Sequence, residues 1–349
     1  MKIKNQSLLV ALFIVFTNLN AQHSFVVQNN GANGYKTLNE AYENASTGDT
    51  IYLPGGSFTM PTINKSLVWI GVGYHPDSCK ATYFTEINNG VYFQGECDNS
   101  FITGIQFNAD VQFGVNGDDA VDIQLIRCRV KGNLRLKYDD NIERNIDMLV
   151  SECIIDRNVN ANLGGNIIIE KSIIRNTLSE FRNSIFDRNV FTLGNRNTSW
   201  GYSYTFTGTQ NCQIRNSVIN KYSYTRWAID NYDCINNNFI HNIFSGSITF
   251  PEGTNTGSDN QTEVDLLTVF ETIDEGIENY SYNHNFHLKA GSPAIAAGTG
   301  GTDIGLYGGS VPFKDGGLPS APHVRKVNIE NETSEGILQV EIEAGSQEN

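Results

Sequence analysis

Aromatic side chains alternate with small polar ones between residues 200 and 207, a pattern that suits carbohydrate binding. The aromatic positions are Trp200, Tyr202, Tyr204 and Phe206, separated by single Gly, Ser or Thr residues. In a strand, this spacing places all four rings on one face. Flat rings with hydroxyl groups fit the apolar faces of sugars, and an exposed patch of them indicates a binding site. The alternative, that the rings pack under a loop or inside a core, stays open.

A second aromatic group follows at positions 222 to 227. Stacked on the first group, Tyr222 and Tyr224 would lie beneath the first two rings, and Arg226 would lie beneath Tyr204. Trp227 comes next along the chain. The predicted carbohydrate-binding residues are therefore Trp200, Tyr202, Tyr204, Tyr222, Tyr224, Arg226 and Trp227.

Three carboxylates lie close together within residues 116–123. Asp118, Asp119 and Asp122 could supply some of the six to eight oxygen ligands that calcium prefers. Calcium is the one cofactor that the sequence suggests, because no phosphate loop, dinucleotide fingerprint or Gly-x-Ser-x-Gly elbow is present. A Gly-Asp-Asp run is also an ordinary turn, and that alternative stays open.

The tripeptide Asp-Arg-Asn occurs twice, with Arg157 and Arg188 at its centre. An Arg next to a carboxylate can bind a sugar acid, and a desolvated Arg can stabilise charge that develops in a reaction. Opposite charges at a turn also serve simply to solvate it. The candidates for catalysis are Asp118, Asp119, Asp122, Arg157 and Arg188.

Six cysteines are spaced as three neighbouring pairs. The pairs are Cys79 with Cys97, Cys128 with Cys153, and Cys212 with Cys234. If the last two pairs stack one coil apart, their members are about 4.8 Å from each other, which permits a disulfide without requiring one. Buried free thiols that pack as small apolar groups are the alternative.

One pattern occurs twice between positions 212 and 244. Cys212, Asn216, Asn220 and Tyr222 recur, in the same order and with the same spacing, as Cys234, Asn238, Asn242 and Phe244. A repeat of this length is typical of a solenoid, in which each coil buries its apolar side chains by stacking on its neighbours. A block of one small residue, two apolar residues and a polar turn also returns between positions 128 and 242, with two blocks expected on different sides of one coil. Stacked Asn side chains would hydrogen-bond along the array.

Each end of the array has its own pattern. Leu38, Ala41, Tyr42 and Ala45 are at helical spacing, which predicts a short helix that caps the first coil. At the other end, residues 324–329 and 337–342 alternate like two strands. We expect a hairpin that covers the C-terminal end of the solenoid, or the remnant of a larger module.

The opening resembles the start of right-handed parallel β-helix proteins of the pectate-lyase-like superfamily, in the secreted form of Gram-negative bacteria. The matching motifs are Gly48–Ile51, Pro54–Gly56 and Gly71–Gly73, and residues 288–308 resemble the closing coil of such proteins. The resemblance implies an all-β solenoid. It also implies that an enzyme of this kind would hold calcium with carboxylates and use an Arg or Lys as base, in a groove along one long face.

The N-terminus predicts export. A basic start, an apolar run from Leu8 to Phe16 and a small residue at Ala21 describe a secretory signal peptide. The net charge of the chain is −14, and it becomes about −16 once residues 1–21, with Lys2 and Lys4, are removed. Such a surface repels phosphate backbones and anionic lipid, so neither nucleic-acid binding nor membrane insertion is expected. Periplasm, cell surface and medium all remain open as destinations.

The predicted architecture has three parts: a signal peptide at 1–21, a right-handed parallel β-helix with an N-terminal helical cap at 22–312, and a short C-terminal β extension at 313–349. The first predicted function is recognition of a polysaccharide or surface glycan through the aromatic face. The alternatives are a calcium-dependent polysaccharide lyase or glycoside hydrolase, and a structural or adhesive surface protein, because a fold does not select one function.

Overall fold

The computed structural model describes most of the chain after residue 21. The described residues are 22–27, 34–80, 82–138, 141–192, 203–220, 226–229, 233–250, 254–274, 277, 279–329, 337 and 339–346. The predicted signal peptide lies outside them. No helix in these ranges is long and apolar enough to span a bilayer.

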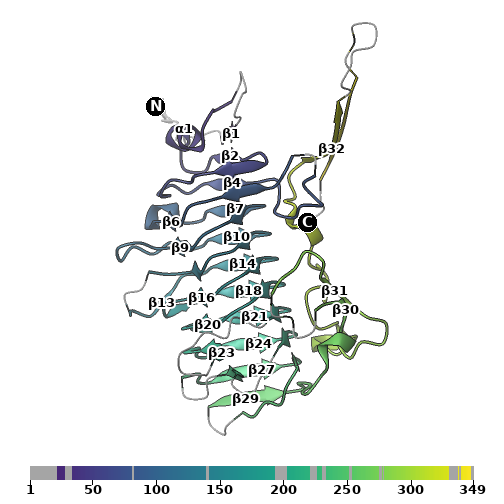
Figure 1. Ribbon diagram of the computed structural model, residues 1–349. Helices are drawn as coiled ribbons and strands as arrows, with labels where there is room; N and C mark the ends of the chain where they lie inside the picture. Colours follow the sequence, from purple (N-terminus) through teal and green to yellow (C-terminus); the bar gives the residue numbers. More distant parts are fainter. Residues whose placement is uncertain are drawn as a thin grey trace, which may run out of the picture.

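The described strands form three long parallel sheets that stack into a column (Figure 1). The eleven-stranded sheet contains β1 (Ser24–Val26), β2 (Thr50–Tyr52), β4 (Val68–Ile70), β7 (Phe101–Thr103), β10 (Gln124–Ile126), β14 (Leu149–Ser151), β18 (Ile168–Glu170), β21 (Ile185–Asp187), β24 (Gln213–Arg215), β27 (Asn237–Ile240) and β29 (Asn255–Ser258). The nine-stranded sheet contains β3 (Gly56–Phe58), β5 (Thr85–Ile87), β8 (Gln106–Phe107), β11 (Arg129–Val130), β15 (Ile154–Ile155), β19 (Ile173–Ile174), β22 (Val190–Phe191), β25 (Val218–Ile219) and β28 (Ile243–Phe244). The seven-stranded sheet contains β6 (Val91–Phe93), β9 (Val111–Phe113), β12 (Leu134–Arg135), β16 (Val159–Asn160), β20 (Leu178–Ser179), β23 (Ser203–Thr207) and β26 (Arg226–Ile229).

Between β4 and β26 each coil contributes one strand to each sheet, so the chain is a right-handed parallel β-helix, as predicted. The repeated sequence block does fall on two sides of a coil. Ser184 leads into β21 of the eleven-stranded sheet, whereas Ser172 leads into β19 of the nine-stranded sheet.

The register expected from the repeat between positions 212 and 244 is wrong. The repeat aligns Asn216 with Asn238, whereas the residue that pairs with Asn238 is Gln213. In the neighbouring sheet Val218 pairs with Ile243 at the same offset. The coil is longer than the sequence repeat, because loops of unequal length separate otherwise similar strands.

A single residue turns the chain from the eleven-stranded to the nine-stranded sheet. This residue has a left-handed backbone in successive coils, namely Arg127 (φ 53°), Glu152 (φ 53°), Lys171 (φ 45°), Arg188 (φ 56°), Asn216 (φ 50°) and His241 (φ 51°). Such a conformation is uncommon for residues other than Gly. Its recurrence means that the stacked coils impose it and that the side chains at this turn line up.

A ladder of small polar side chains follows the turn. Asn242 shows its chemistry: its Oδ1 accepts from the Ser217 amide (3.0 Å), and its Nδ2 donates to the Ile214 carbonyl (2.8 Å). The ladder runs through Cys128, Cys153, Ser172, Asn189, Ser217, Asn242 and Asn260. It satisfies backbone groups that a tight buried turn would leave unpaired, and it confirms the expected hydrogen bonding of stacked Asn side chains.

The cysteines are free thiols in this structure. All six are buried, and no disulfide joins the candidate pairs Cys79 with Cys97, Cys128 with Cys153 and Cys212 with Cys234. The Sγ atoms instead donate to backbone carbonyls. Cys128 donates a hydrogen bond to the Ile126 carbonyl (3.4 Å), and Cys153 donates one to the Ser151 carbonyl (3.2 Å).

The capping helix is confirmed as α1 (Leu38–Asn44), which lies over the first coil. The Thr37 side chain accepts from the Glu40 amide, and the Glu40 side chain accepts from the Thr37 amide, so both halves of a capping box are present. Tyr42 packs on Trp69 of the core with ring centroids 6.1 Å apart. The helix thereby keeps the apolar end of the column away from water.

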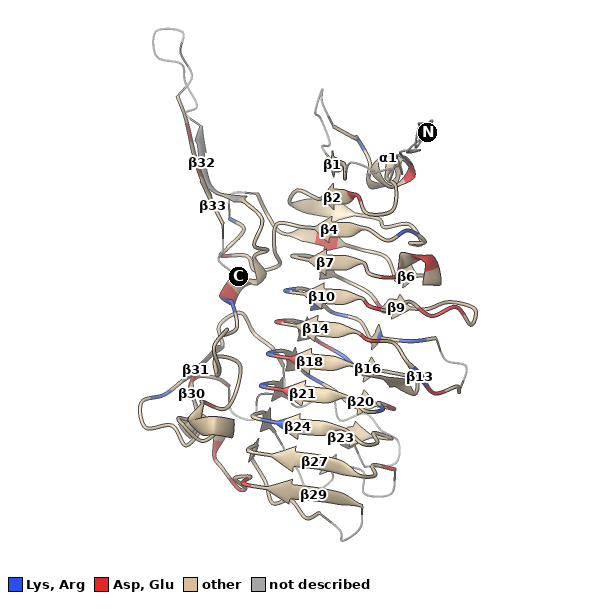
Figure 2. Ribbon diagram, turned by 180° about the vertical axis from the view of Figure 1, so that it is seen from behind, with Lys and Arg blue, Asp and Glu red and all other residues tan. Residues whose placement is uncertain are grey.

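Beyond β29 the chain turns back along the column (Figures 1 and 2). The described residues between 264 and 319, here called the strap, cover an apolar row on the outside of the nine-stranded sheet. The row consists of Ile154, Ile173, Val190, Val218 and Ile243. Residues 288–308 therefore belong to the strap and do not form a closing coil. The remaining short elements are β13 (Arg144–Asn145), β17 (Gly164–Gly165), β30 (Phe270–Thr272), β31 (Asn285–Leu288) and 3-10 turns at Gly95–Cys97, Leu266–Thr268, Thr299–Gly301 and Asp315–Gly317.

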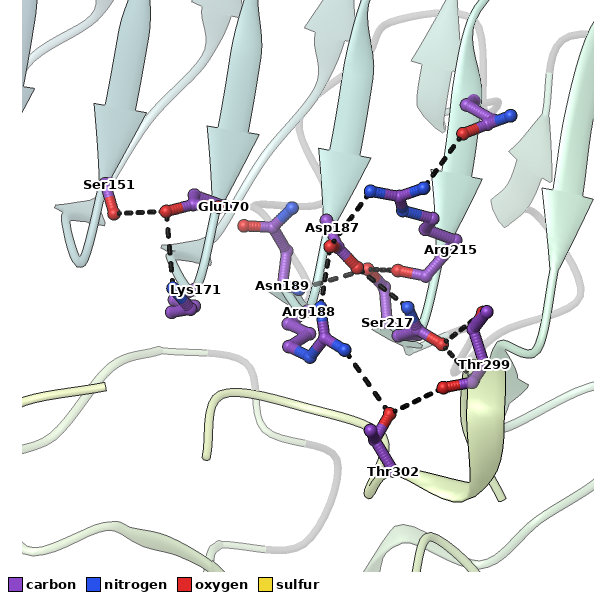
Figure 3. A network of polar contacts seen from close by, with 12 residues as sticks. Ser151, Glu170, Lys171, Asp187, Arg188, Asn189, Arg215, Ser217, Thr299 and Thr302 are labelled. Carbon is purple, nitrogen blue, oxygen red and sulfur yellow. Dashed lines mark hydrogen bonds and ion pairs between the residues drawn. The ribbon is translucent and has the colours of Figure 1, made fainter. Parts of the chain in front are cut away.

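The aligned turn side chains hold the strap in place (Figure 3). The contacts run in opposite order along the two segments: Asn216 accepts from the Thr299 amide (2.8 Å), Arg188 donates to Thr302 Oγ1 (3.3 Å), Glu152 accepts from the Lys314 amide (2.8 Å) and Arg127 donates to the Leu318 carbonyl (3.3 Å). The Asp187 carboxylate supports the contact between Arg188 and Thr302 by accepting a hydrogen bond from the same guanidinium (2.7 Å).

The predicted hairpin forms as β32 (His323–Ile329) and β33 (Val340–Gly345), paired antiparallel. It lies near the end of the column that α1 caps and points away from the coils (Figure 1). It does not cover the C-terminal end, because the strap carries the chain back past most of the stack before the hairpin begins.

Candidate functional site

The three long sheets present different faces to the outside. The strap covers the nine-stranded sheet. The eleven-stranded sheet has a mixed outward row, in which the exposed Gln124 lies between Phe101 and Leu149 and is followed by Ile168. The seven-stranded sheet shows polar side chains instead. Of the three faces, the seven-stranded sheet is the one whose chemistry suits a ligand rich in hydroxyl groups.

One outward row crosses six strands of the seven-stranded sheet in continuous register. It consists of Tyr92, Gln112, Arg135, Asn160, Ser179 and Thr207, and we call it the polar row. Each of these side chains is half-buried or exposed, with Tyr92 at 46%. At about 4.8 Å per strand the polar row extends over about 24 Å, which is long enough to contact several consecutive units of a linear polymer.

Strand geometry fixes the direction of these side chains. The residues on both sides of Tyr92, Gln112, Arg135 and Asn160 are buried in the column, as Val111 and Phe113 are beside Gln112, and the residue before Ser179 and the residue before Thr207 are buried as well. Because side chains alternate along a strand, the polar member between them must point outward. Gln112 donates from Nε2 to the Gly114 carbonyl (3.0 Å), and its Oε1 is left to accept from a ligand hydroxyl.

The charges on this face balance each other. Arg135 forms an ion pair with Asp110 (3.0 Å), and both side chains are 39% exposed. Burial acts to raise the pKa of Asp110, but hydrogen bonds from Asn133 and the charge of Arg135 outweigh it and hold the pKa below its usual value. Asp110 is therefore ionised at neutral pH, and the pair contributes no net charge to the face.

Only part of the predicted aromatic face falls on described residues, in β23 and β26 of this sheet. Trp200, Tyr202, Tyr222 and Tyr224 lie outside the described residues. Tyr204 on β23 is half-buried, and Phe206 is fully buried against core rings. The predicted stacking is wrong by one residue, because Tyr204 pairs with Trp227 and Ser203 pairs with Arg226.

The three predicted calcium ligands do not converge. Asp119 is bound to Arg144 and to the Tyr138 amide (3.0 Å), whereas Asp118 is exposed in the turn after β9. Asp122 is exposed at a left-handed turn (φ 55°) that leads toward the eleven-stranded sheet. Within the described part of the chain, no three His, Cys, Asp or Glu side chains are grouped so that they could hold a metal ion. The residues present do not fit a calcium site.

The two predicted arginines lie in different settings. Arg157 is exposed at the turn after β15. Arg188 is the turn residue that binds Asp187 and Thr302, and its side chain is 15% exposed. Arg188 therefore fixes the strap, and the structure does not bring the two arginines together with the Asp118 turn at one place on the surface.

Sequence reasoning missed the polar row. Its members come one from each coil and lie far apart along the chain, so no local motif joins them. The detectable signal is an outward polar residue next to a buried aliphatic one, as in Leu134-Arg135 and Val159-Asn160. That signal becomes informative only when the strand register is known.

No protein-family model matches the sequence, and no curated protein matches it. Among solved structures, the crystal structure of pectate lyase Pel9A aligns with 82% of this chain and 96% of that chain, at 12% sequence identity and a TM-score of 0.31. The strand order and pairing, and not this likeness, establish the fold. By that strand order the chain is a right-handed parallel β-helix protein, which confirms the fold implied by the resemblance in its sequence.

Proposed function

We propose that this protein recognises a neutral polysaccharide, which lies along the seven-stranded sheet in contact with the polar row. The observation that carries the proposal is the register of the polar row, in which six coils each place a hydrogen-bonding side chain outward at the same position. Amide, hydroxyl and guanidinium groups can pair with sugar hydroxyls as donors and acceptors. The exposed ring of Tyr92 adds a surface for an apolar sugar face.

A neutral glycan is favoured over an acidic one. The chain carries a net charge of −14, which slows the approach of a polyanion. The positive charge on the row, Arg135, is already paired with Asp110. Binding is expected to survive chelation, since no described carboxylate group is arranged to hold calcium. The predicted signal peptide supports a place of action outside the cytoplasm.

The test is affinity electrophoresis of the mature chain in gels that contain neutral or acidic polysaccharides, run with calcium and with EDTA. We expect retardation by a neutral polysaccharide in both conditions. Replacing Tyr92 and Gln112 together by Ala is expected to weaken binding at least about tenfold, the effect of losing one or two hydrogen bonds and a ring contact.

The matched control is Gln124→Ala, which removes the same kind of side chain from an exposed outward position on the eleven-stranded sheet. It should leave retardation unchanged. Equal losses in Gln112→Ala and Gln124→Ala would argue against the seven-stranded sheet as the binding face. Ultraviolet absorbance of unsaturated sugar ends, abolished by EDTA, would instead make the protein a lyase.

A further inference from the structure

A second group of polar and aromatic side chains lies on the opposite flank, where the strap crosses the nine-stranded sheet. The outward row that the strap covers is apolar from Ile154 onward, but its preceding members are Gln106 and Arg129. Two strap residues, Tyr280 and Tyr282, cover Arg129, with ring centroids 5.1 and 4.9 Å from its guanidinium carbon. The strap therefore changes from an apolar cover to a polar, aromatic cluster at this coil.

The ion pair at the centre of the cluster does not use all of its hydrogen-bonding groups, although the Arg129 side chain also contacts the Tyr282 hydroxyl. Arg129 donates from Nε (2.9 Å) and from Nη2 (2.8 Å), and both bonds go to Oδ2 of Asp156. The Nη1 group of Arg129 and the Oδ1 atom of Asp156 lie outside this pair. The two side chains are 11% and 14% exposed, so an edge of the pair still reaches solvent. Hydrogen bonds to charged groups of this kind are about twice as strong as neutral ones.

The tyrosines around the pair have different tasks. The hydroxyl of Tyr282 donates to the Tyr74 carbonyl (3.0 Å) and contacts Gln106 (3.3 Å), which fixes the ring. Tyr280 is half-buried, and among the described residues its hydroxyl has no hydrogen-bond partner. Burial raises the pKa of Tyr280, so the hydroxyl keeps its proton and can both donate and accept.

Two histidines border the cluster. His75 packs edge-on against Tyr282 with centroids 4.7 Å apart. Its Nδ1 accepts from the Asp77 amide (3.2 Å), so in the neutral ring Nε2 carries the proton. Burial lowers the pKa of His75, which keeps it neutral at pH 7. His287 is 51% exposed and stacks on Tyr307 at 3.8 Å, offering a flat outer face.

We propose that this cluster is a second saccharide subsite, which binds the vicinal hydroxyl groups of a single neutral sugar residue. The inference rests on the proposed function, because it assigns the subsite to the same class of ligand. One sugar hydroxyl donates to Asp156 Oδ1, and its neighbour accepts from Arg129 Nη1. Tyr280 supplies a third hydrogen bond. A carboxylate ligand is disfavoured because Asp156 already neutralises the arginine, and a cationic ligand is disfavoured because Arg129 occupies the tyrosine rings.

The test is isothermal titration of the mature chain with free neutral monosaccharides, namely glucose, galactose, mannose and xylose, and with glucuronate. We expect saturable binding of at least one neutral sugar, a loss of about tenfold or more in Tyr280→Ala, and a smaller loss in Tyr280→Phe, which keeps the ring and removes the hydroxyl. Circular dichroism of both variants checks that they remain folded.

Tyr92→Ala separates this subsite from the polar row. It should weaken the binding of polysaccharide and leave the binding of monosaccharide unchanged, whereas Tyr280→Ala should weaken monosaccharide binding about tenfold or more. Monosaccharide binding that is as tight in Tyr280→Ala as in the wild type, or that is absent from the wild type, overturns the subsite even if polysaccharide binding stands. Polysaccharide binding that fails while Tyr280-dependent monosaccharide binding persists overturns the polar row alone.

Discussion

At the scale of single residues, the column depends on polar atoms that find partners inside it. Asn242 and its equivalents bond backbone groups of the coil before them, and Cys128 and Cys153 occupy the same ladder with thiols. A cysteine fits there because it is small, largely apolar and a weak donor. Its position in the ladder explains its burial without any need for a covalent bond.

The thiols are expected to be inert in the folded protein. Burial raises the pKa of Cys79 and Cys212 to about 11, and that of Cys97 and Cys128 to about 12. Because the thiolate is the reactive form, a disulfide-forming reagent such as Ellman's reagent should react slowly with the native chain at pH 8. In guanidinium, without reductant, six thiols should react. A lower count that reductant restores would show that disulfides form.

The sequence predicted the surroundings of these residues only in part. The spacing of Cys128 and Cys153 correctly indicated that the two residues stack one coil apart, but a distance that permits a disulfide does not decide whether the disulfide forms. The alternating pattern around Tyr204 correctly predicts a strand. It does not predict the register between β23 and β26, which pair with Tyr204 opposite Trp227 and not opposite Arg226.

At the scale of elements, the N-terminal cap depends on one carboxylate. Asp49 accepts from the His23 amide through Oδ1 and from the Ser46 amide through Oδ2, both at 2.8 Å, which ties the first strand to the end of α1. Burial acts to raise the pKa of Asp49, but these hydrogen bonds and the nearby His23 outweigh it and lower the pKa. The folded state therefore favours the ionised form.

The consequence is a pH-dependent contribution to stability. A lowered pKa gives stability that is fully present above the ordinary value, about 3.9, and lost as the pH falls through the folded value. Asp49→Asn should lower the free energy of unfolding by about 1–3 kcal/mol at pH 7, and the difference from the wild type should shrink below about pH 4. Denaturant unfolding at several pH values measures it.

The control is Asp77→Asn, at an exposed carboxylate whose pKa is lowered by Lys80 on the surface. Surface ion pairs contribute little, so this change should leave the free energy of unfolding nearly unchanged at any pH. If Asp49→Asn behaves in the same way, the two amide hydrogen bonds do not hold the cap.

Helix α1 was predictable because its signals are local. Thr37 and Glu40 form the capping box, and the apolar spacing sits within one short segment. The strap was not predictable, since its docking joins residues far apart, as in the contact between Arg127 and Leu318. Neither residue can be recognised as a docking contact from the sequence alone, because the two come together only in the folded column.

At the scale of the whole molecule, the column divides its three faces among different tasks. The strap shields the apolar outward row of the nine-stranded sheet, while the polar row of the seven-stranded sheet stays accessible. The chain could be recognised as a solenoid from its repeats. The face that is available for binding could not be predicted from the sequence, because it depends on where the strap lies after the chain leaves β29 (Figure 2).

Hydroxyl-radical footprinting of the mature chain, with and without a saturating neutral polysaccharide, locates the binding face. If the polysaccharide lies along the seven-stranded sheet, Tyr92 and Arg135 of the polar row become protected together. The exposed Tyr83 and the outward Ile168 of the eleven-stranded sheet should keep their reactivity. Protection of Ile168 without protection of Tyr92 and Arg135 would contradict binding along the seven-stranded sheet.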